Sequence, residues 1–208
     1  MVESELGIIP KGWEVVELGS LVDIIDNRGK TPPQENAKTE YPIIDVKALS
    51  GERRIIEYNN CMKFVSKETY ENWFRSGHPK EGDILLSTVG SLAEMKIFYG
   101  SVGCIAQNVV ALRNKDISNL YLYQQMKYIK NELISYNIGS VQPSIKITHI
   151  IKHKIIKPSF EMVQKYHNIV NILTEKIYTN FVEIQNIEDI RDTLLPKLMS
   201  GEIRVPFK

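Results

Sequence analysis

The chain has 208 residues, 43% of them hydrophobic and 25% charged, with a formal net charge of +1 at pH 7. This composition is ordinary for a globular protein and excludes a fibrous or low-complexity chain. The sequence has no signal-like leader and no run of 18 apolar residues, so we expect a cytoplasmic protein without a membrane partner. Cys61 and Cys104 lie far apart, which argues against a CxxC metal site and a disulfide framework.

Short apolar runs bounded by turn residues predict strands at 41–46, 84–88, 95–99 and 108–112. Two helices are predicted between and after these strands. Ser66 is placed to cap a helix that runs through Trp73, and Ser118 a longer helix from about 119 to 134. The longer helix carries an apolar face made of Leu122, Met126, Ile129 and Leu133. Residues 1–157 are therefore expected to form a globular domain of the α+β class.

The stretch GDILLSTVGSL, residues 82–92, has the glycines of a phosphate-binding loop. The nucleotide-binding spacing G-x-x-x-x-G-K-[ST] is absent, because the glycines lie too far apart and Ser91, not lysine, follows Gly90. The pattern instead predicts a buried strand between turns at Gly82-Asp83 and Gly90-Ser91.

Positive charge is concentrated between Lys127 and Lys157. Six lysines against one acid, Glu132, give 6 − 1 = +5, and His149 and His153 lie in the same stretch. Such a segment is suited to lie along a phosphate backbone, although a solvated lysine face fits the charge equally well.

A long helix is predicted in the second part, residues 158–208. No glycine or proline interrupts 161–195, a length of about 50 Å at about 1.5 Å per residue. A heptad register gives an apolar or aromatic seam broken only by Asn180 and Arg191. We expect Pro196 to stop or kink the helix and Gly201 to let the chain turn away. The predicted dimerisation residues on this seam are Val163, Tyr166, Val170, Leu173, Ile177, Asn180, Ile184, Ile187 and Leu194.

Such a seam calls for a partner, because a compact domain is too small to cover the whole stripe. Pairing with a second copy of the chain is the sharper interpretation, and a helix that folds back along its own domain is the alternative.

Catalytic patterns are weak. Asp45-Val46-Lys47 resembles the D-x-K end of a Mg²⁺-dependent nuclease site, for which Glu35 or Glu40 would have to supply the second acid. His149 and His153 are four residues apart, but their isoleucine-rich surroundings predict an extended or irregular segment, and no third ligand is evident. No nucleophile elbow or dinucleotide motif occurs. We therefore predict no catalytic residues, no metal site and no bound cofactor.

Several stretches together resemble the DNA specificity subunits of type I restriction–modification systems. They occur in the family's order and cover nearly the whole chain: IPKGWEVVELGSL at 9–21, NRGKTP at 27–32, GDILLSTVGSL at 82–92, AQNVVAL at 106–112, SVQPSI at 140–145, IIKPSFEMVQK at 155–165 and RDTLLPKLMSGEI at 191–203. The chain departs from the family in length, since members usually carry two target recognition domains and two long helices. It is similar to a half-length form.

The resemblance implies a non-catalytic subunit that reads one half of a split target in double-stranded DNA. Paired antiparallel helices would set the gap between the two halves. Methyl transfer with S-adenosylmethionine, and cleavage, would belong to separate modification and restriction subunits. A homodimer through the long helix would read a palindromic split target, because its twofold symmetry would be repeated in the DNA.

Basic, amide and hydroxyl side chains near predicted turns and strand ends are expected to touch DNA. They are Arg28, Lys30, Thr31, Lys47, Arg53, Arg54, Thr88, Ser91, Lys96, Gln107, Ser140, Gln142, Ser144 and Lys146. The segment from Ser140 to Lys146 is the strongest of these predictions. Two alternatives stay open: a stand-alone nuclease that uses Asp45 and Lys47, and a scaffold that contacts only protein. The sequence does not give the DNA target or the gap length.

Overall fold

The computed structural model describes residues 1–100 and 102–204, so the last four residues of the predicted second domain lie outside the described part. The chain divides into two compact units, Met1–His167 and Asn168–Lys208. The first unit mixes short strands and short helices, and the second is formed by most of one long helix. The predicted α+β class with a long carboxyl-terminal helix is confirmed.

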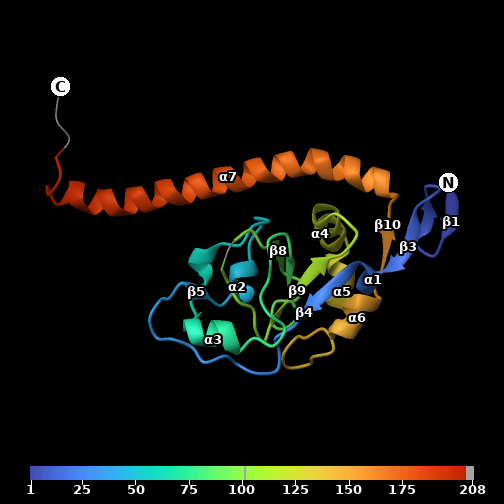
Figure 1. Cartoon of the computed structure of the whole chain (residues 1–208), viewed down its shortest axis with the longest axis horizontal. Helices are drawn as coiled ribbons and strands as arrows, with labels where there is room; N and C mark the ends of the chain where they lie inside the picture. Colours follow the sequence, from blue (N-terminus) through green and yellow to red (C-terminus); the bar gives the residue numbers. More distant parts are fainter. Residues whose placement is uncertain (101, 205–208) are drawn as a thin grey trace. The chain divides into compact units, whose positions relative to one another are not determined.

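A four-stranded antiparallel sheet lies at the centre of the first unit (Figure 1). Its strands are arranged in the order β4 (Val22–Ile25), β9 (Val109–Asn114), β7 (Ile84–Ser87) and β8 (Met95–Ile97). In β7 every side chain is buried, and Ile84 is paired with Leu112 of β9 on one side and Ile97 of β8 on the other. The buried strand predicted within GDILLSTVGSL is therefore confirmed, and glycines with positive φ angles flank it at Gly82 (87°) and Gly90 (84°).

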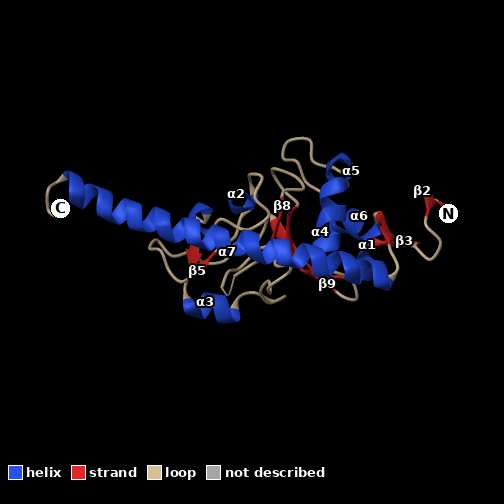
Figure 2. Ribbon diagram, turned by 90° about the horizontal axis from the view of Figure 1, so that it is seen from above, coloured by secondary structure: helices blue, strands red, loops and turns tan. Residues whose placement is uncertain are grey.

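Three two-stranded ribbons complete the strands, and Figure 2 shows the loops that join them. They are β1 (Val2–Ser4) with β2 (Gly7–Ile9), β5 (Tyr41–Pro42) with β6 (Phe64–Val65), and β3 (Glu14–Glu17) with β10 (Lys154–Lys157). The third ribbon pairs Glu14 with Lys157. It therefore attaches β10, the strand before the long helix, to the amino-terminal part of the chain.

Short helical segments of the described residues lie between the strands: α1 (Leu18–Leu21), α2 (Val46–Leu49), the 3₁₀ turn η1 (Tyr58–Asn60), α3 (Lys67–Asn72), α4 (Asn119–Tyr128), α5 (Lys130–Ser135) and α6 (Ile147–Lys152). Both predicted caps are present. The Ser66 hydroxyl accepts a hydrogen bond from the N–H of Thr69, and the Ser118 hydroxyl accepts one from Tyr121. Each cap satisfies a backbone donor that the first helical turn leaves free.

The core contains two clusters of buried side chains. A large cluster joins Leu85 and Val109 of the sheet to Ile44, Leu49 and Phe98. A second cluster joins Val65 of β6 to Phe74 and Cys104. Burial raises the pKa of the Cys104 thiol to about 12, so this cysteine is a neutral core residue.

Three sequence expectations need correction. The strand expected at 41–46 is ordered as β5 for two residues only, because Asp45 caps α2 with its carboxylate. The helix expected at 119–134 breaks at Ile129 into α4 and α5, although the predicted apolar face stays buried. The segment around His149, expected to be extended or irregular, is helix α6.

Close packing between α1 and α6 accounts for the helical conformation of α6. Ile150 of α6 is fully buried. Opposite α6, Gly19 of α1 leaves so little room that a Cβ atom at this position would lie 2.9 Å from the Cβ of Ile151. This tertiary contact is not visible in the local isoleucine pattern, and it stabilises a helix where propensity favoured an extended chain.

The long helix α7 spans Phe160–Met199. Pro196 was expected to stop or kink the helix, but it does not stop it, since α7 continues to Met199. The missing N–H of proline removes a hydrogen bond only in the last turn of the helix. The helix closes where the N–H of Gly201 donates to the carbonyl of Leu198 at 3.2 Å. None of the helices in the described part of the chain is both long and apolar enough to cross a membrane.

Candidate DNA-binding surface

Thr88, at the end of β7, joins four segments that are distant in the sequence. Its N–H donates to the carbonyl of Asn108 (2.7 Å), and its own carbonyl accepts from the N–H of Ile145 (2.8 Å). Its hydroxyl accepts from Nη1 of Arg28 at 3.3 Å. The N–H of Gly90 donates to the carbonyl of Pro143. We call residues 26–31, 88–91, 107–108 and 139–144 together the four-segment surface.

Arg28 is held rigidly on this surface. Its Nε and Nη2 donate to the two carboxylate oxygens of Asp26, at 2.9 and 2.7 Å, in the forked geometry that arginine and a carboxylate favour. Burial pushes the pKa of the Asp26 carboxyl up, but the hydrogen bonds and charge of Arg28 outweigh it and lower that pKa below its usual value. The guanidinium is thus preorganised before any ligand arrives.

Thr31 and Gln107 meet although 76 residues separate them. The side-chain amide of Gln107 donates to the Thr31 hydroxyl, and both side chains are exposed. Gln107 has a φ angle of 50°, a backbone conformation that is uncommon for a non-glycine residue. An exposed amide on a constrained backbone is well suited to read a base edge.

The loop at 139–144, which joins α5 to α6 (gold in Figure 1), is clamped from within. The Oδ1 of Asn137 accepts from the N–H of Gly139 (3.0 Å) and of Ser144 (2.9 Å). The N–H of Ile138 donates to the carbonyl of Ser144 at 2.9 Å. Asn137 was missed by the sequence reasoning, although an Asn two residues before a Gly is a turn signal that could have pointed to it.

The clamp closes the loop tightly and leaves its tip exposed. A Cβ atom on Gly139 would lie 1.8 Å from the carbonyl oxygen of Gln142, so only glycine fits there. Ser140, Gln142 and Pro143 are exposed, and Val141 is 97% exposed. Lys146 follows the loop as an exposed residue at the start of α6. The loop therefore presents polar side chains on a fixed backbone.

A pocket of about 340 Å³ lies beside Arg28. Four of its residues were not predicted as site residues: Asn27, Asn72, Trp73 and Arg75. Asn27 belongs to the NRGKTP turn, and the other three come from α3 and the turn after it, which sequence patterns did not connect with the NRGKTP turn.

Two residues predicted to contact DNA have side chains that the fold buries. Lys96 is fully buried on β8, where its ammonium group lies 3.4 Å from the Glu57 carboxylate. Burial lowers the pKa of Lys96, and the Glu57 charge opposes that change. The Thr88 side chain is also fully buried, so it supports the surface from below and does not touch a ligand itself.

Other predicted contacts lie elsewhere. Arg53 is paired with Glu57 at 3.9 Å, and the carbonyl of Arg54 accepts from the N–H of Ile97 in β8, so both belong with the buried Lys96 site. Lys47 is exposed on α2. Ser91 and Lys30 are exposed on the four-segment surface, and Ser144 is half-buried in the loop clamp.

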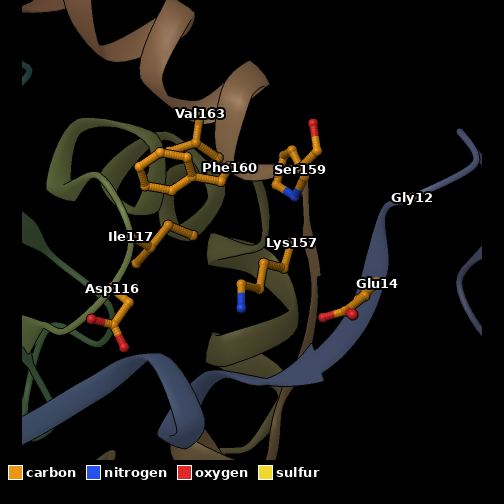
Figure 3. A pocket seen from close by; sticks show the side chains of 9 residues that line it. Gly12, Glu14, Asp116, Ile117, Lys157, Ser159, Phe160 and Val163 are labelled. Carbon is orange, nitrogen blue, oxygen red and sulfur yellow. The ribbon is translucent and has the colours of Figure 1, made fainter.

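The basic stretch 127–157 does not form one continuous positive stripe. Lys130 is paired with Glu94 at 2.8 Å, and Lys154 with Glu5. Lys157 points into a second pocket, of about 390 Å³, where β10 turns into α7; Asp116 and Glu14 line the same pocket (Figure 3). Acidic residues from other parts of the chain therefore neutralise much of the positive charge of this stretch.

The arrangement around Asp45 does not resemble a nuclease centre. Its carboxylate accepts from the N–H of Lys47 at 3.0 Å and is paired with Lys63 at 3.6 Å. Within residues 1–100 and 102–204 no group of three or more His, Cys, Asp or Glu side chains is placed to hold a metal ion. The D-x-K pattern is explained by a helix cap.

The two histidines of the basic stretch pack around one tyrosine. The rings of His149 and His153 each lie 5.8 Å from the Tyr136 ring, and the Tyr136 hydroxyl is hydrogen-bonded to Nδ1 of His153 at 2.9 Å. Nε2 of His153 lies 3.5 Å from the Glu132 carboxylate. Burial lowers the pKa of His153, while Glu132 opposes that change. These contacts hold Tyr136 directly before the Asn137 clamp.

The first two predicted seam residues pack within the first unit. Val163 is 5% exposed, so it is not available to a second copy. Tyr166 lies edge-on against Tyr121, with ring centroids 5.9 Å apart. His167 is hydrogen-bonded to the Ser118 hydroxyl at 2.9 Å. The first two turns of α7 are thus anchored on α4.

The rest of the seam carries exposed apolar side chains. Exposed seam residues are Leu173, Ile177, Ile184, Ile187 and Leu194, Asn180 is exposed between them, and Val170 is half-buried. Ile169, Ile172, Ile190 and Leu195 are exposed as well, although the heptad prediction did not include them. The apolar stripe is therefore wider than a strict two-position seam.

Comparison with known proteins found a matching family and several similar relatives. Residues 10–191 match the model of the family described as type I restriction modification DNA specificity domain. A type I restriction enzyme MjaIX specificity subunit of Methanocaldococcus jannaschii is 31% identical over 205 residues, which cover 95% of this chain and 46% of the relative. A HindI specificity subunit of Haemophilus influenzae is 25% identical over 204 residues, which cover 94% of this chain and 42% of the relative.

The fold is also found in solved structures. The crystal structure of an HsdS subunit from Thermoanaerobacter tengcongensis superposes with a TM-score of 0.58 at 19% identity, over 83% of this chain and 40% of that one. The chain spans about half the length of the curated relatives it matches.

Proposed function

This chain belongs to the family of type I restriction modification DNA specificity domains, and from that premise we propose that it recognises one half of a split target in double-stranded DNA. The four-segment surface is the proposed reading site. It brings Arg28, Thr31, Gln107 and the loop at 139–144 together around Thr88.

The observation that carries the proposal is the clamped loop. Reading bases requires donors and acceptors that are held in place before binding, because ordering a loose loop would cost part of the binding free energy. Asn137 fixes the backbone, and Gln142 and Ser140 stay exposed at the tip. A glutamine amide both donates and accepts, as the N6 and N7 edge of adenine requires.

The direct test is selection of bound sequences from a random duplex library, with affinity measured at several salt concentrations. We expect one short preferred half-site and a preference over unrelated DNA that persists at 0.15 M salt, on the order of 10³-fold or more. Equal affinity for all sequences at every salt concentration would contradict the proposal.

The second part of the proposal concerns α7. Its exposed apolar stripe pairs with a second helix of the same kind, in a second copy of the chain, and so sets the gap between two half-sites. A rigid pair also binds more tightly than two separate domains, because the second contact becomes intramolecular. Sedimentation of the purified chain tests the pairing.

We further propose modification and restriction subunits as the partners of this chain, acting in the cytoplasm, with S-adenosylmethionine bound by the modification subunit. Methylated sites mapped in cells that carry the chain and a modification partner test this assignment. One motif that appears only when both are present supports it, and an unchanged methylation pattern contradicts it.

A scaffold that contacts only protein is the competing function. Phosphate contacts are strongest at low salt, so a DNA-reading chain should bind duplex DNA at 50 mM salt. Complete absence of binding under that condition would favour the scaffold. Incubation with DNA and Mg²⁺ should leave the DNA intact, since Asp45 is a helix cap.

A further inference from the structure

We propose that the pocket lined by Asn27, Arg28, Lys30, Asn72, Trp73 and Arg75 binds one backbone phosphate of the DNA, a subsite that fixes the register of the reading loop. This inference rests on the proposed function and assigns a separate task to this part of the surface. We call the pocket the phosphate pocket.

The phosphate pocket has a rigid frame. Asn27 is 2% exposed, and its side-chain amide donates to the carbonyl of Gly77 at 2.9 Å while its Oδ1 accepts from the N–H of Ser76 at 2.9 Å. The Ser76 hydroxyl donates to the carbonyl of Asp26 at 2.7 Å. Three hydrogen bonds thus join Asp26 and Asn27, where the NRGKTP turn begins, to the turn after α3, about 50 positions along the chain.

Three cationic side chains line the pocket and no carboxylate does. Arg28 is fixed by Asp26, and Arg75 donates from Nη2 to the carbonyl of Arg28 at 2.9 Å. A guanidinium has five N–H donors, so Arg75 keeps donors for a ligand. Lys30 is exposed and has no ion pair or side-chain hydrogen bond within the described residues. The charge complement of this pocket is an anion.

A phosphate suits this pocket better than a base edge. The charged groups here can only donate, and among base edges only that of guanine presents two acceptors without a donor. The guanine edge carries no net charge, whereas a phosphate carries the negative charge that several neighbouring cations favour. A phosphate oxygen accepts hydrogen bonds from guanidinium and ammonium groups alike, and such contacts position a protein on DNA without reading sequence. The half-buried Trp73 gives the pocket an apolar wall against which a deoxyribose can pack.

The phosphate pocket is connected to the reading loop through two residues. Arg28 lines the pocket and donates to the Thr88 hydroxyl, and the carbonyl of Thr88 accepts from Ile145 directly after the loop. A phosphate held at Arg28 is therefore at a fixed place relative to Gln142. This link sets which base pair the loop meets.

The test compares three single variants with the wild-type chain: Lys30→Ala, Arg75→Lys and Lys38→Ala. Lys38 is the matched control, because it is exposed in the same loop, carries the same charge and does not line the pocket. Affinity for the selected duplex and for a scrambled duplex is measured from 50 to 300 mM salt. The slope of log K against log salt reports the number of phosphates contacted.

For Lys30→Ala we expect the slope to become shallower by about 1, with the same fractional loss of affinity on both duplexes. Arg75→Lys keeps the charge and should keep the slope, and Lys38→Ala should match the wild type. Lys30→Ala is not expected to unfold the chain, since Lys30 has no partner among the residues that the structure describes, and an unchanged melting temperature checks this.

An unchanged slope for Lys30→Ala, with normal wild-type binding, would overturn the phosphate pocket and leave the proposed function intact. A loss of affinity restricted to the selected duplex would overturn it too, because it would indicate a base contact. If the wild-type chain binds no DNA, the proposed function itself fails, and the pocket with it.

Discussion

At the scale of single residues, charge alone was a poor guide to which side chains meet solvent. Lys96 and Lys30 are both lysines near turns, yet Lys96 is fully buried with Glu57 and Lys30 is exposed beside the phosphate pocket. Asn137 and Asn27 contribute more to the structure of the site than most of the predicted cations do. Each of them holds a backbone segment in place through paired hydrogen bonds.

Asn137→Ala is expected to loosen the reading loop. Without Oδ1, the N–H groups of Gly139 and Ser144 lose their acceptor. Because both hydrogen bonds are exposed and water can replace the acceptor, we expect a cost of about 0.5 to 1.5 kcal/mol for each. Amide exchange at these two positions should become faster, and preference for the selected half-site should fall. Asn137→Asp keeps the acceptor and serves as the control; equal exchange in both variants would contradict the clamp.

His153 gives stability a pH dependence. Burial lowers its pKa in the folded chain, so the unfolded chain takes up the proton first, near pH 6.5. The free energy of unfolding should be highest above pH 6.5 and fall as the pH is lowered from there. Denaturant titrations should show that the free energy of unfolding of His153→Gln depends less on pH than that of the wild type. Some dependence should remain, because burial lowers the pKa of His78 as well. A profile identical to the wild type would contradict this role.

At the scale of elements, local sequence predicted those pieces whose signals are contained within one turn or one strand. The caps at Ser66 and Ser118 and the strand within GDILLSTVGSL are of this kind. Helix α6 was missed because its support comes from α1, more than 100 positions earlier. Only the packed structure reveals such a contact.

Gly19→Ala tests the packing of α1 against α6. The added methyl group would lie 2.9 Å from Ile151 and force the two helices apart, at a cost of about 1 to 3 kcal/mol. Thermal unfolding measures the loss. Gly12→Ala is the comparison, because Gly12 has a positive φ angle but open space around the added methyl group. Its loss of stability therefore measures backbone strain without steric overlap. A loss no larger for Gly19→Ala would contradict the argument.

The seam of α7 is tested with Leu173→Ala and Ile177→Ala in one chain. Removing two exposed apolar side chains from a paired helix should weaken association, on the order of tenfold or more, with the fold of the first unit unchanged. Sedimentation against concentration measures the effect. Lys176→Ala, outside the seam, is the control. Val163→Ala should instead destabilise the first unit, because Val163 packs within it.

At the scale of the whole molecule, symmetry turns the proposed pairing into a prediction about DNA. Two identical chains related by a twofold axis must present the same reading surface twice, so the methylated target should be a palindrome interrupted by a gap. Mapping methylated bases in cells with the chain and its modification partner checks this outcome. A split target with two unrelated halves would contradict pairing between identical copies.

The sequence by itself determined the α+β class, the buried strand at the centre of the sheet, the long helix and the resemblance to specificity subunits. These features follow from patterns that repeat over a few residues or from ordered motifs. Tertiary structure decided the site. Arg28 meets Thr88 across 60 positions, and Thr31 meets Gln107 across 76. No local pattern encodes such contacts, because they depend on how the whole core packs, which also buried Lys96 and left Lys30 in solvent.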